Sequence, residues 1–148
     1  MATPLQIAAM TCVFANGGRW YRPHLVKSIL DSNDRLVRQI STDPVRENFI
    51  NPYNINIVRQ GMRQAVTLGS ARRLSSLPVS AAGKTGTAQW SSKKKPHAWF
   101  TGFAPYDNPE LVLTILVEEG GEGSAVSVPI AQKFLDWYYR DFKQKNEY

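Results

Sequence analysis

The 148-residue sequence has one cysteine, two histidines and no run of eighteen apolar residues. A single cysteine, Cys12, allows no internal disulfide, so a disulfide-stapled scaffold is excluded. His24 and His97 have no partner cysteine or carboxylate at metal-ligand spacing, so we expect a structural or rim role for both and no metal site. Without a long apolar run or a basic segment leading into one, we expect neither a membrane span nor a signal peptide in this chain.

Acidic residues are scarce in the first half of the chain. Residues 1–75 carry ten Lys and Arg against four Asp and Glu, whereas residues 76–148 carry eight of each. A net charge of +6 is compatible with nucleic acid or an acidic polymer as a partner. The basic residues are scattered over several expected elements and are not clustered among aromatics, which favours a generally basic, solvated surface and no nucleic-acid partner. A small basic interaction module is therefore the alternative hypothesis.

The apolar content, 43% of all residues, is enough for one core, and its spacing predicts three helices. Thr3-Pro4 precedes the first, a short buried helix that ends at Asn16-Gly17-Gly18. Asn51-Pro52 opens the second, and Gly69 lies just beyond its end. Ser127 is expected to cap the third, which runs to about residue 142. The three apolar stripes are Leu5, Ala8, Ala9, Cys12 and Val13; Ile55, Val58, Met62, Ala65 and Val66; and Ile130, Phe134, Leu135 and Tyr138.

Two groups of β-prone runs are present. Residues 25–30 and 35–40 flank an Asp-Ser-Asn-Asp turn and predict a small peripheral hairpin. A linker over residues 70–78 then leads to three strands, expected at residues 79–90, 98–104 and 111–118. The last two are joined through the stretch PYDNP at residues 105–109, too short for a parallel crossover, so the strands should meander antiparallel. The third strand is nearly all apolar and should be covered on both faces.

Lys84-Thr85-Gly86-Thr87 is the motif that bears on function. A phosphate-binding loop would need glycine at position 78, where the residue is Pro78, and would have to open a helix. The residues that follow are β-friendly, so this reading fails on both counts. Lys-Thr-Gly on a strand is one of the three signatures of serine penicillin-recognising enzymes, beside Ser-x-x-Lys and Ser-x-Asn.

Several other stretches accompany the triplet in order. They are ATPLQ at residues 2–6, ANGG at 15–18, GKTGTAQ at 83–89, HAWFTGFAP at 97–105 and EEGGEG at 118–123. Together they make the chain resemble the C-terminal part of the transpeptidase domain of class B penicillin-binding proteins, and within that class the penicillin-binding protein 2 group of the cell-elongation machinery. The resemblance implies acyl transfer from D-Ala-D-Ala stem peptides of peptidoglycan, with penicillins as mimics of the donor.

The resemblance also implies roles for the motif. Thr85 and Thr87 hydroxyls would bind the terminal carboxylate of the substrate, with Lys84 supplying positive potential. Gly86 would let the ligand lie against the strand as an added β-partner. The Thr87 backbone N–H would be an oxyanion donor, so Thr87 and Lys84 are the expected catalytic contributors. Three further residues are expected at the rim of the site: Gln89, Trp90 and His97. No cofactor is implied.

The other two signatures of the family are missing. No asparagine has serine two residues before it, so Ser-x-Asn does not occur. Ser91 and Ser92 have Lys94 and Lys95 three residues later, but this lysine-rich stretch lies between two strands and not at a helix start. We therefore expect neither serine to be the nucleophile, and expect the chain alone to be inactive. As a hypothesis, the loop of residues 93–95 flanks the cleft and attracts acidic stem peptides.

The expected fold class is α+β, a three-stranded antiparallel sheet packed with helices, as part of a β-lactamase-like transpeptidase fold. Residues 1–148 would form the C-terminal portion of one domain, with a helical part at 1–75 and the sheet and closing helix at 76–148. The parent protein would be anchored in the cytoplasmic membrane with this domain on the extracytoplasmic side, beside a glycosyltransferase partner. In that family the sheet has five strands. The edge of the strand at 111–118 should therefore recruit a replacement by self-association, a domain swap or a separate N-terminal piece.

Overall fold

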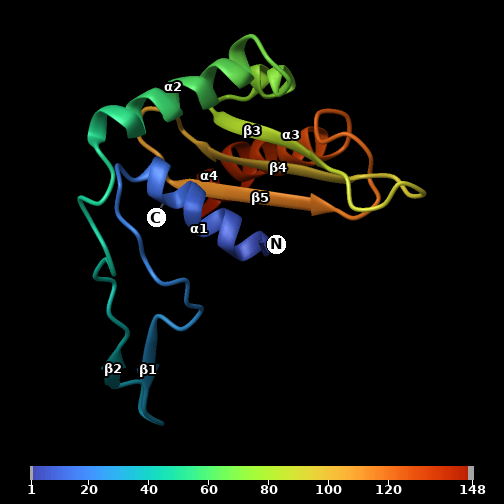
Figure 1. Ribbon diagram of the computed structural model, residues 1–148. Coiled ribbons are helices and arrows are strands. Elements are labelled where there is room, and N and C mark those ends of the chain that lie inside the picture. The colour runs from blue at the N-terminus through green and yellow to red at the C-terminus, as the bar shows by residue number, and fades with distance from the viewer. Residues whose placement is uncertain (1, 147–148) are drawn as a thin grey trace.

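The computed structural model describes residues 2–146, so residues 1, 147 and 148 of the expected domain lie outside it. A three-stranded antiparallel sheet with the order β3-β4-β5 has helices on both faces, and a two-stranded hairpin lies at the end of a long arm (Figure 1). The elements are α1 (Pro4–Ala15), β1 (Ser28–Leu30), β2 (Leu36–Gln39), α2 (Pro52–Thr67), β3 (Ala82–Ala88), β4 (His97–Ala104), β5 (Leu111–Val117), α3 (Ser127–Trp137) and α4 (Lys143–Asn146). The expected α+β class and the antiparallel meander are confirmed.

Helix α1 begins as its sequence predicts. The Thr3 hydroxyl accepts a hydrogen bond from the Gln6 N–H at 3.2 Å, and the Gln6 side chain accepts one from the Thr3 N–H at 2.9 Å. This capping box satisfies two of the free N–H groups of the first turn. The expectation that the whole helix is buried is wrong, because Leu5 is 62% exposed and the buried residues, Thr11, Val13 and Ala15, are confined to the second half.

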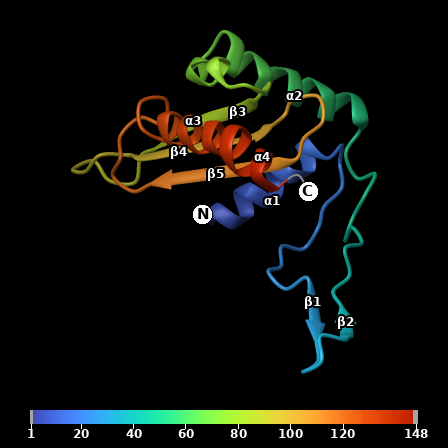
Figure 2. The ribbon, with the colours of Figure 1, turned by 180° about the vertical axis from the view of Figure 1, so that it is seen from behind.

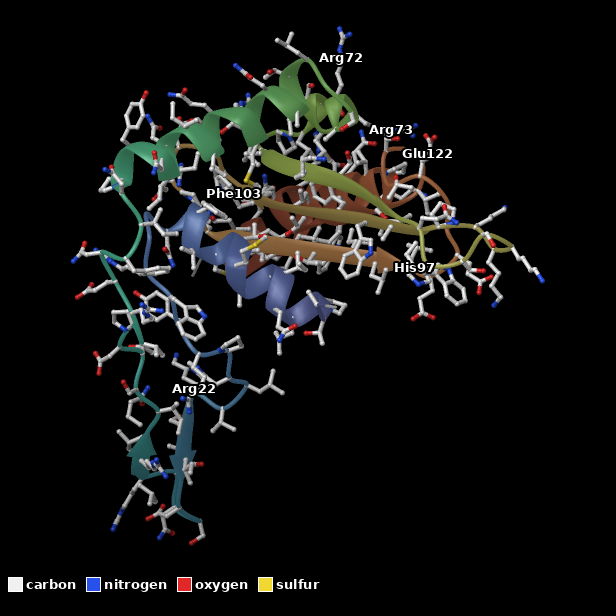
Figure 3. The ribbon with its side chains drawn as sticks, in the orientation of Figure 1. Arg22, Arg72, Arg73, His97, Phe103 and Glu122 are labelled. Atoms are coloured by element: carbon white, nitrogen blue, oxygen red, sulfur yellow. The ribbon has the colours of Figure 1, made fainter. Side chains whose placement is uncertain are left out.

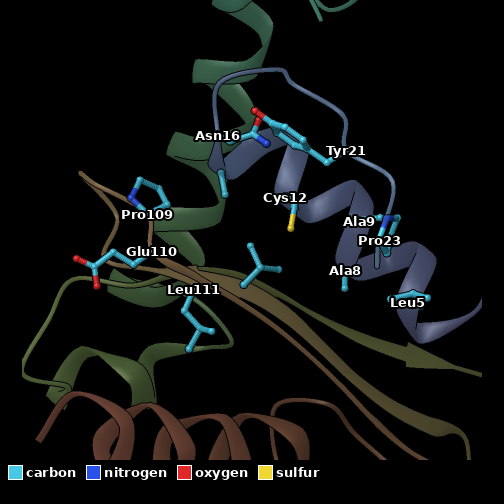
Figure 4. Close-up of a pocket in the computed structure, with 12 residues that line it drawn as sticks. Leu5, Ala8, Ala9, Cys12, Asn16, Tyr21, Pro23, Pro109, Glu110 and Leu111 are labelled. Carbon is cyan, nitrogen blue, oxygen red and sulfur yellow. The ribbon is translucent and has the colours of Figure 1, made fainter. Parts of the chain in front are cut away.

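The apolar stripe of α1 lines an open pocket instead of a sealed core. Leu5, Ala8, Ala9 and Cys12 face the start of β5 across a space of about 340 Å³ (Figure 4). Partial burial in this wall raises the pKa of the Cys12 thiol. The stripe was identified from its spacing, but spacing alone does not say whether enough neighbouring chain is present to cover it.

Helix α2 follows its predicted bounds. The Asn51 side chain accepts a hydrogen bond from the Tyr53 N–H at 2.9 Å, and Pro52 occupies the first turn, where its missing N–H costs nothing. Ile55, Met62 and Val66 are buried, as expected from their spacing, but Val58 of the same predicted stripe is 39% exposed.

The segment after α2 is more than a linker. Residues 72–76 form a 3-10 turn, and Ala71, Leu74 and Leu77 are buried in the same core as the sheet. The sequence expectation of a plain linker over residues 70–78 was therefore wrong. Its apolar residues are spaced three apart, which is the period of a 3-10 helix and is too short a pattern to recognise in sequence.

The register of the sheet defines two faces. Thr85, Phe100 and Ile115 lie opposite one another across the three strands and belong to one face, here named the closed face. Their neighbours along each strand point the other way, so Lys84, Thr101 and Thr114 mark the second face, here named the open face. Helix α3 covers the closed face, as seen from behind in Figure 2, and α1 crosses the open face, as seen in Figure 1.

The closed face carries the larger core. Phe100 is 1% exposed at its centre, and Val128 and Ala131 of α3 are fully buried against it. Strand β5 is covered by α3 on this face and by α1 on the other, as its apolar sequence predicts. All seven of its residues are nevertheless only half-buried, because β5 pairs with β4 alone within residues 2–146.

The open face is held partly by polar contacts. The Thr101 hydroxyl lies 2.7 Å from those of both Thr11 and Thr114, which links α1 to β4 and β5. The Arg59 guanidinium of α2 donates to the carbonyls of Ala15 and Tyr106, each at 2.6 Å, and so joins the end of α1 to the β4–β5 turn. A smaller apolar cluster that includes Phe103 fills the same end of this face (Figure 3).

Two expectations about the closing helix need correction. Ser127 is the first residue of α3 and not its cap, and its buried hydroxyl has no hydrogen-bond partner within the described residues. The buried stripe contains Val128, Ala131 and Leu135, whereas Ile130 is 44% exposed. Small residues such as Ala131 let the helix axis approach the sheet closely, so the larger aromatics lie at its flanks. A π-helical turn over Tyr138–Phe142 ends the predicted continuous helix.

The arm, residues 19–50, confirms the peripheral hairpin in shortened form. Strands β1 and β2 pair antiparallel over three and four residues and lie well away from the sheet (Figures 1 and 2). Leu25, Leu36 and Val37 are among its exposed apolar residues.

Candidate functional site

The Lys-Thr-Gly motif lies on β3, at one edge of the sheet. Within the described residues β3 pairs only with β4, so alternate backbone groups on its other side have no strand partner. A cleft of about 850 Å³ opens beside it on the open face. Its walls are β3, β4 and β5, helix α1 with Ile7 and Met10, and the end of the β3–β4 hairpin.

Lys84 is the cationic group of this cleft. Its side chain is exposed, lines the cleft, and donates a hydrogen bond from Nζ to the Thr85 carbonyl. Within residues 2–146 it forms no ion pair. Although the Glu118 carboxylate also lines the cleft, an ammonium group that forms no ion pair, in a mostly apolar wall, is suited to attract an anionic ligand.

The two threonines of the motif lie on the other face from Lys84. The Thr85 hydroxyl is 2.6 Å from the hydroxyl of Ser70, beyond the end of α2. The Thr87 hydroxyl accepts a long hydrogen bond, 3.4 Å, from the Gly123 N–H. Thr85 still contributes to the wall of the cleft, but Thr87 does not line it. Strand alternation thus divides the motif between the two sides of an edge strand.

Gly86 is enclosed by its neighbours. A Cβ at this position would lie 3.1 Å from the Trp99 Cβ, and the backbone of Gly86 is crowded on the other side by Gly123. Gly123 itself has no room for a side chain, because a Cβ would collide with the carbonyl oxygens of Gly86 and Trp99. The glycine-rich segment after β5 therefore packs closely against the motif through Gly123.

The expected rim residues lie at the end of the sheet from which the β3–β4 loop projects, where Figure 3 labels His97. The Trp90 ring stacks on His97 with centroids 5.2 Å apart, and the Lys94 ammonium lies 4.7 Å from the Trp90 centroid. The Gln89 side chain donates to the carbonyls of Ser91 and Lys94 in its own loop. All three rim residues line the cleft, but each is also committed to holding this loop.

His97 has a defined hydrogen-bonding role. Its Nδ1 accepts the N–H of Glu119 at 3.0 Å, so the neutral ring carries its proton on Nε2. His24 lies on the arm, where its Nδ1 is 3.0 Å from the Arg22 carbonyl. In residues 2–146, no three His, Cys, Asp or Glu side chains are grouped so that they would hold a metal ion.

The family follows from comparison with known proteins. A family model for the penicillin-binding protein transpeptidase domain matches residues 1–136. The chain belongs to the penicillin-binding protein transpeptidase family. None of the matches reported below supports the alternative of a nucleic-acid-binding module.

Curated relatives of this transpeptidase-family chain have names that agree. It is 36% identical to the peptidoglycan D,D-transpeptidase MrdA of Haemophilus influenzae, over 93% of this chain and 24% of that protein. It is 30% identical to the peptidoglycan D,D-transpeptidase PbpA of Mycolicibacterium smegmatis, over 88% of this chain and 28% of that protein. The chain thus spans about a quarter of these relatives.

Solved structures of the family give the same fold. Pseudomonas aeruginosa PBP2, in complex with WCK 5153, superimposes with a TM-score of 0.79 and 38% identity, over 95% of this chain and 31% of that one. Penicillin-binding protein A of M. tuberculosis, as an imipenem acyl-enzyme complex, superimposes with a TM-score of 0.83 and 28% identity, over 94% of this chain and 31% of that one. The transpeptidase fold expected from the sequence is confirmed.

Two features of the site in this transpeptidase-family chain could not be predicted from the sequence. Ser70, which touches Thr85, belongs to no motif and lay in the expected linker. The lysine loop is less free than its composition indicates, because Lys94 forms an ion pair with Glu119 at 2.6 Å. Ser91 and Ser92 lie in this loop and not on a helix, as expected from their position between two strands.

Proposed function

We propose that this chain supplies the Lys-Thr-Gly wall of a site for penicillin binding and peptidoglycan D,D-transpeptidation, as the C-terminal portion of one transpeptidase domain. The relatives that carry the name D,D-transpeptidase support this reading. Because the chain spans about a quarter of them, the complete reaction belongs to a longer protein.

One observation supports the proposal above the others. Lys84, without an ion pair in the described residues, projects from an edge strand into a large apolar cleft, and Thr85 of the same strand also lines that cleft. A cation and a hydroxyl-bearing residue in one wall suit a carboxylate that is attached to an otherwise apolar or peptidic ligand. The terminal carboxylate of a D-Ala-D-Ala stem peptide has this chemistry, and so has the carboxylate of a β-lactam.

The acyl transfer itself would use the wall as follows. A serine attacks the carbonyl of the terminal peptide bond, the tetrahedral oxyanion forms, and D-alanine leaves with a proton on its amine. Lys84 and Thr85 would hold the carboxylate, and the Thr87 N–H would donate to the oxyanion, a role whose loss typically costs about 3 kcal/mol. An amine of a neighbouring stem peptide then attacks the ester and frees the serine.

The nucleophile would come from outside this chain. Ser-x-Asn does not occur in the sequence, and both Ser-x-x-Lys spacings fall in the β3–β4 loop. The edge of β5 would be covered either by a second copy of the chain, through self-association or a domain swap, or by a separate N-terminal piece that completes the sheet. A monodisperse monomer that persists on dilution, measured by light scattering on the chain alone, would contradict this part of the proposal.

The cellular setting is proposed on the same basis. We place the domain on the extracytoplasmic side of a membrane-anchored parent, beside a glycosyltransferase that makes the glycan strands. Within residues 2–146, no helix has the length and apolarity needed to cross a bilayer.

Labelling with a fluorescent penicillin tests the proposed function. The chain alone should acquire no covalent label, and the protein encoded by the full reading frame that contains it should label. Lys84→Ala should slow labelling about tenfold or more, because it removes the cation that attracts the carboxylate. Lys133→Ala is the matched control, since it removes the same charge from an exposed position on α3 that does not line the cleft, and should leave labelling within about twofold. Failure of the full-length protein to label would refute the proposal.

A further inference from the structure

The hydroxyl pair between Ser70 and Thr85 has no part in the motif-based account of the site. The two oxygens are 2.6 Å apart although the residues are fifteen positions apart in sequence. We infer that Ser70 is a positioning residue for carboxylate recognition, which orients the Thr85 hydroxyl toward the ligand and makes the site selective for ligands that carry a carboxylate. This inference rests on the proposed function of the Lys-Thr-Gly wall.

Ser70 is held firmly although its side chain is exposed. The Ala71 N–H donates to the Ala65 carbonyl at 2.9 Å across the end of α2, and Ala71 is fully buried. Gly69 fits tightly in this turn, because a Cβ there would lie 2.9 Å from the Ala65 Cα. The Ser75 hydroxyl donates to the Val66 carbonyl at 2.9 Å and closes the turn from the other side. The main chain at Ser70 is therefore part of a rigid support.

The same support is fixed relative to the motif strand. Arg63 of α2 donates from Nη1 to the Ala81 carbonyl at 2.7 Å, immediately before β3 begins. Leu74 and Leu77, just after Ser70, are buried in the core that contains Phe100 of the neighbouring strand. Ser70 thus keeps its place beside Thr85 through one hydrogen bond and shared core packing, and not through the hydroxyl contact alone.

Counting protons shows what the pair offers a ligand. Each hydroxyl carries one proton, and one of the two is used in the hydrogen bond between Ser70 and Thr85. When Ser70 donates to Thr85, the Thr85 proton is free to be donated to a carboxylate, and the first hydrogen bond polarises the second. Without Ser70, the Thr85 hydroxyl has no other hydrogen-bond partner among residues 2–146 to fix its direction. This gain in binding should appear only with ligands that present a negatively charged oxygen, since hydrogen bonds to charged groups are stronger than those between neutral groups.

The test compares two probes on the full-length protein that contains this chain. One is a penicillin with its free carboxylate, and the other is the methyl ester of the same penicillin. The second-order rate constant of acylation is measured for wild type, Ser70→Ala, Ser70→Thr and Thr85→Val. Ser92→Ala is the control, because this loop serine has no hydroxyl contact in the described residues and does not line the cleft.

We expect Ser70→Ala to slow acylation by the carboxylate probe about tenfold and by the ester less than about twofold. Ser70→Thr, which keeps the hydroxyl, should restore the rate to within about threefold of wild type. Thr85→Val should show the same selectivity for the carboxylate probe. The variant that combines Ser70→Ala with Thr85→Val should be acylated only slightly more slowly than either single variant, because the two residues act as a unit. Ser92→Ala should match wild type with both probes.

Other results would overturn the inference. Equal losses with the two probes, or no loss with either, would show that Ser70 only supports the turn. The ratio of the two rates is taken within one variant, so it remains decisive even where Ser70→Ala lowers the melting temperature. If wild type acylates normally and Ser70→Ala keeps its selectivity, the inference alone fails. If wild type does not acylate, the proposed function fails and the inference with it.

Discussion

Different interactions hold the two faces of the sheet against their helices. The closed face is sealed by α3 and the 3-10 turn, and its core residues Phe100, Val128 and Leu74 are at most 1% exposed. The open face is tied by hydroxyl groups and the Arg59 guanidinium, and an apolar cleft remains beside Trp99 and Leu116. Apolar burial stabilises the first, and hydrogen bonds locate elements on the second without filling the space between them.

This difference explains how one short motif serves both structure and ligand. The Thr85 side chain lies on the closed-face side of the edge strand, where Ser70 holds it, but Thr85 also lines the cleft into which Lys84 projects from the open face. A rigid face thereby fixes a strand whose other face is left accessible. Binding sites commonly rely on such an arrangement, with the ligand-contacting groups carried by a well-packed element.

The largest expected effect is at the centre of the closed face. Phe100→Ala should lower the free energy of unfolding by about 3–5 kcal/mol, because it removes a fully buried ring and leaves a cavity. Urea denaturation of the chain followed by circular dichroism measures the change. Met10→Ala, on the exposed side of α1, is the matched control and should change stability by less than about 1 kcal/mol. Similar losses of stability for the two variants would contradict the conclusion that apolar burial stabilises the closed face more than the open face.

On the open face, Arg59→Ala should cost about 2 kcal/mol. The change leaves the carbonyls of Ala15 and Tyr106 without their donor and removes the contact with the Phe103 ring. Arg59→Lys should recover less than half of the loss, because an ammonium cannot reach both carbonyls in the geometry of a guanidinium. Full recovery with lysine would mean that only the charge matters here. Chemical denaturation of the two variants provides the comparison.

The pH dependence of stability tests the packing of Tyr139 on the closed face. Burial, with a further contribution from the nearby Glu110 carboxylate, raises the pKa of the Tyr139 phenol well above its ordinary value of 10.0. The folded state therefore holds this proton more tightly than the unfolded chain does. The resulting stability is fully present below pH 10 and declines as pH rises above that value.

Tyr139→Phe should separate this pH effect from the hydrogen bond. The tyrosine hydroxyl donates to the Ala104 carbonyl at 2.7 Å, so the variant should lose about 1 kcal/mol at neutral pH. Above pH 10 the variant should decline less steeply than wild type, as measured by urea denaturation at a series of pH values. Parallel pH profiles for the two proteins would show that another group controls alkaline unfolding.

The smallest effect is expected at the loop beside the cleft. The ion pair of Lys94 and Glu119 is about half exposed, with side-chain exposures of 51% and 44%. Lys94→Ala should therefore change stability by less than about 1 kcal/mol, even with the loss of its contact to the Trp90 ring. High salt should reduce the difference between variant and wild type further. A loss above 2 kcal/mol would mean that the loop shares in the core of the protein.

Local signals in the sequence predicted the elements well. Thr3-Pro4 and Asn51-Pro52 located the starts of α1 and α2, because capping depends on a few adjacent residues. The short connection before β5 predicted an antiparallel pair, and the register confirms it. The family, too, followed from short motifs in a fixed order.

Predictions failed where a distant contact decides the outcome. Ser127 looked like a cap, but the packing of α3 on the sheet buries it as the first helical residue. Ile130 had the right spacing for a buried face, yet the small side chain of Ala131 is what brings the helix close. Leu5 belongs to a true apolar stripe that nothing in residues 2–146 covers fully.

The sequence by itself determined the motif, the order of the elements and the transpeptidase family, because each depends on residue identity at short range. Only the tertiary structure decided that the motif strand lies at an edge with the Lys84 side facing a cleft, and that Ser70 is brought beside Thr85 from another element. Ser70 matches no sequence motif, and its role depends on the residues that folding brings next to it. Its position depends on the packing of α2 and the 3-10 turn against the sheet, which no stretch of adjacent residues encodes.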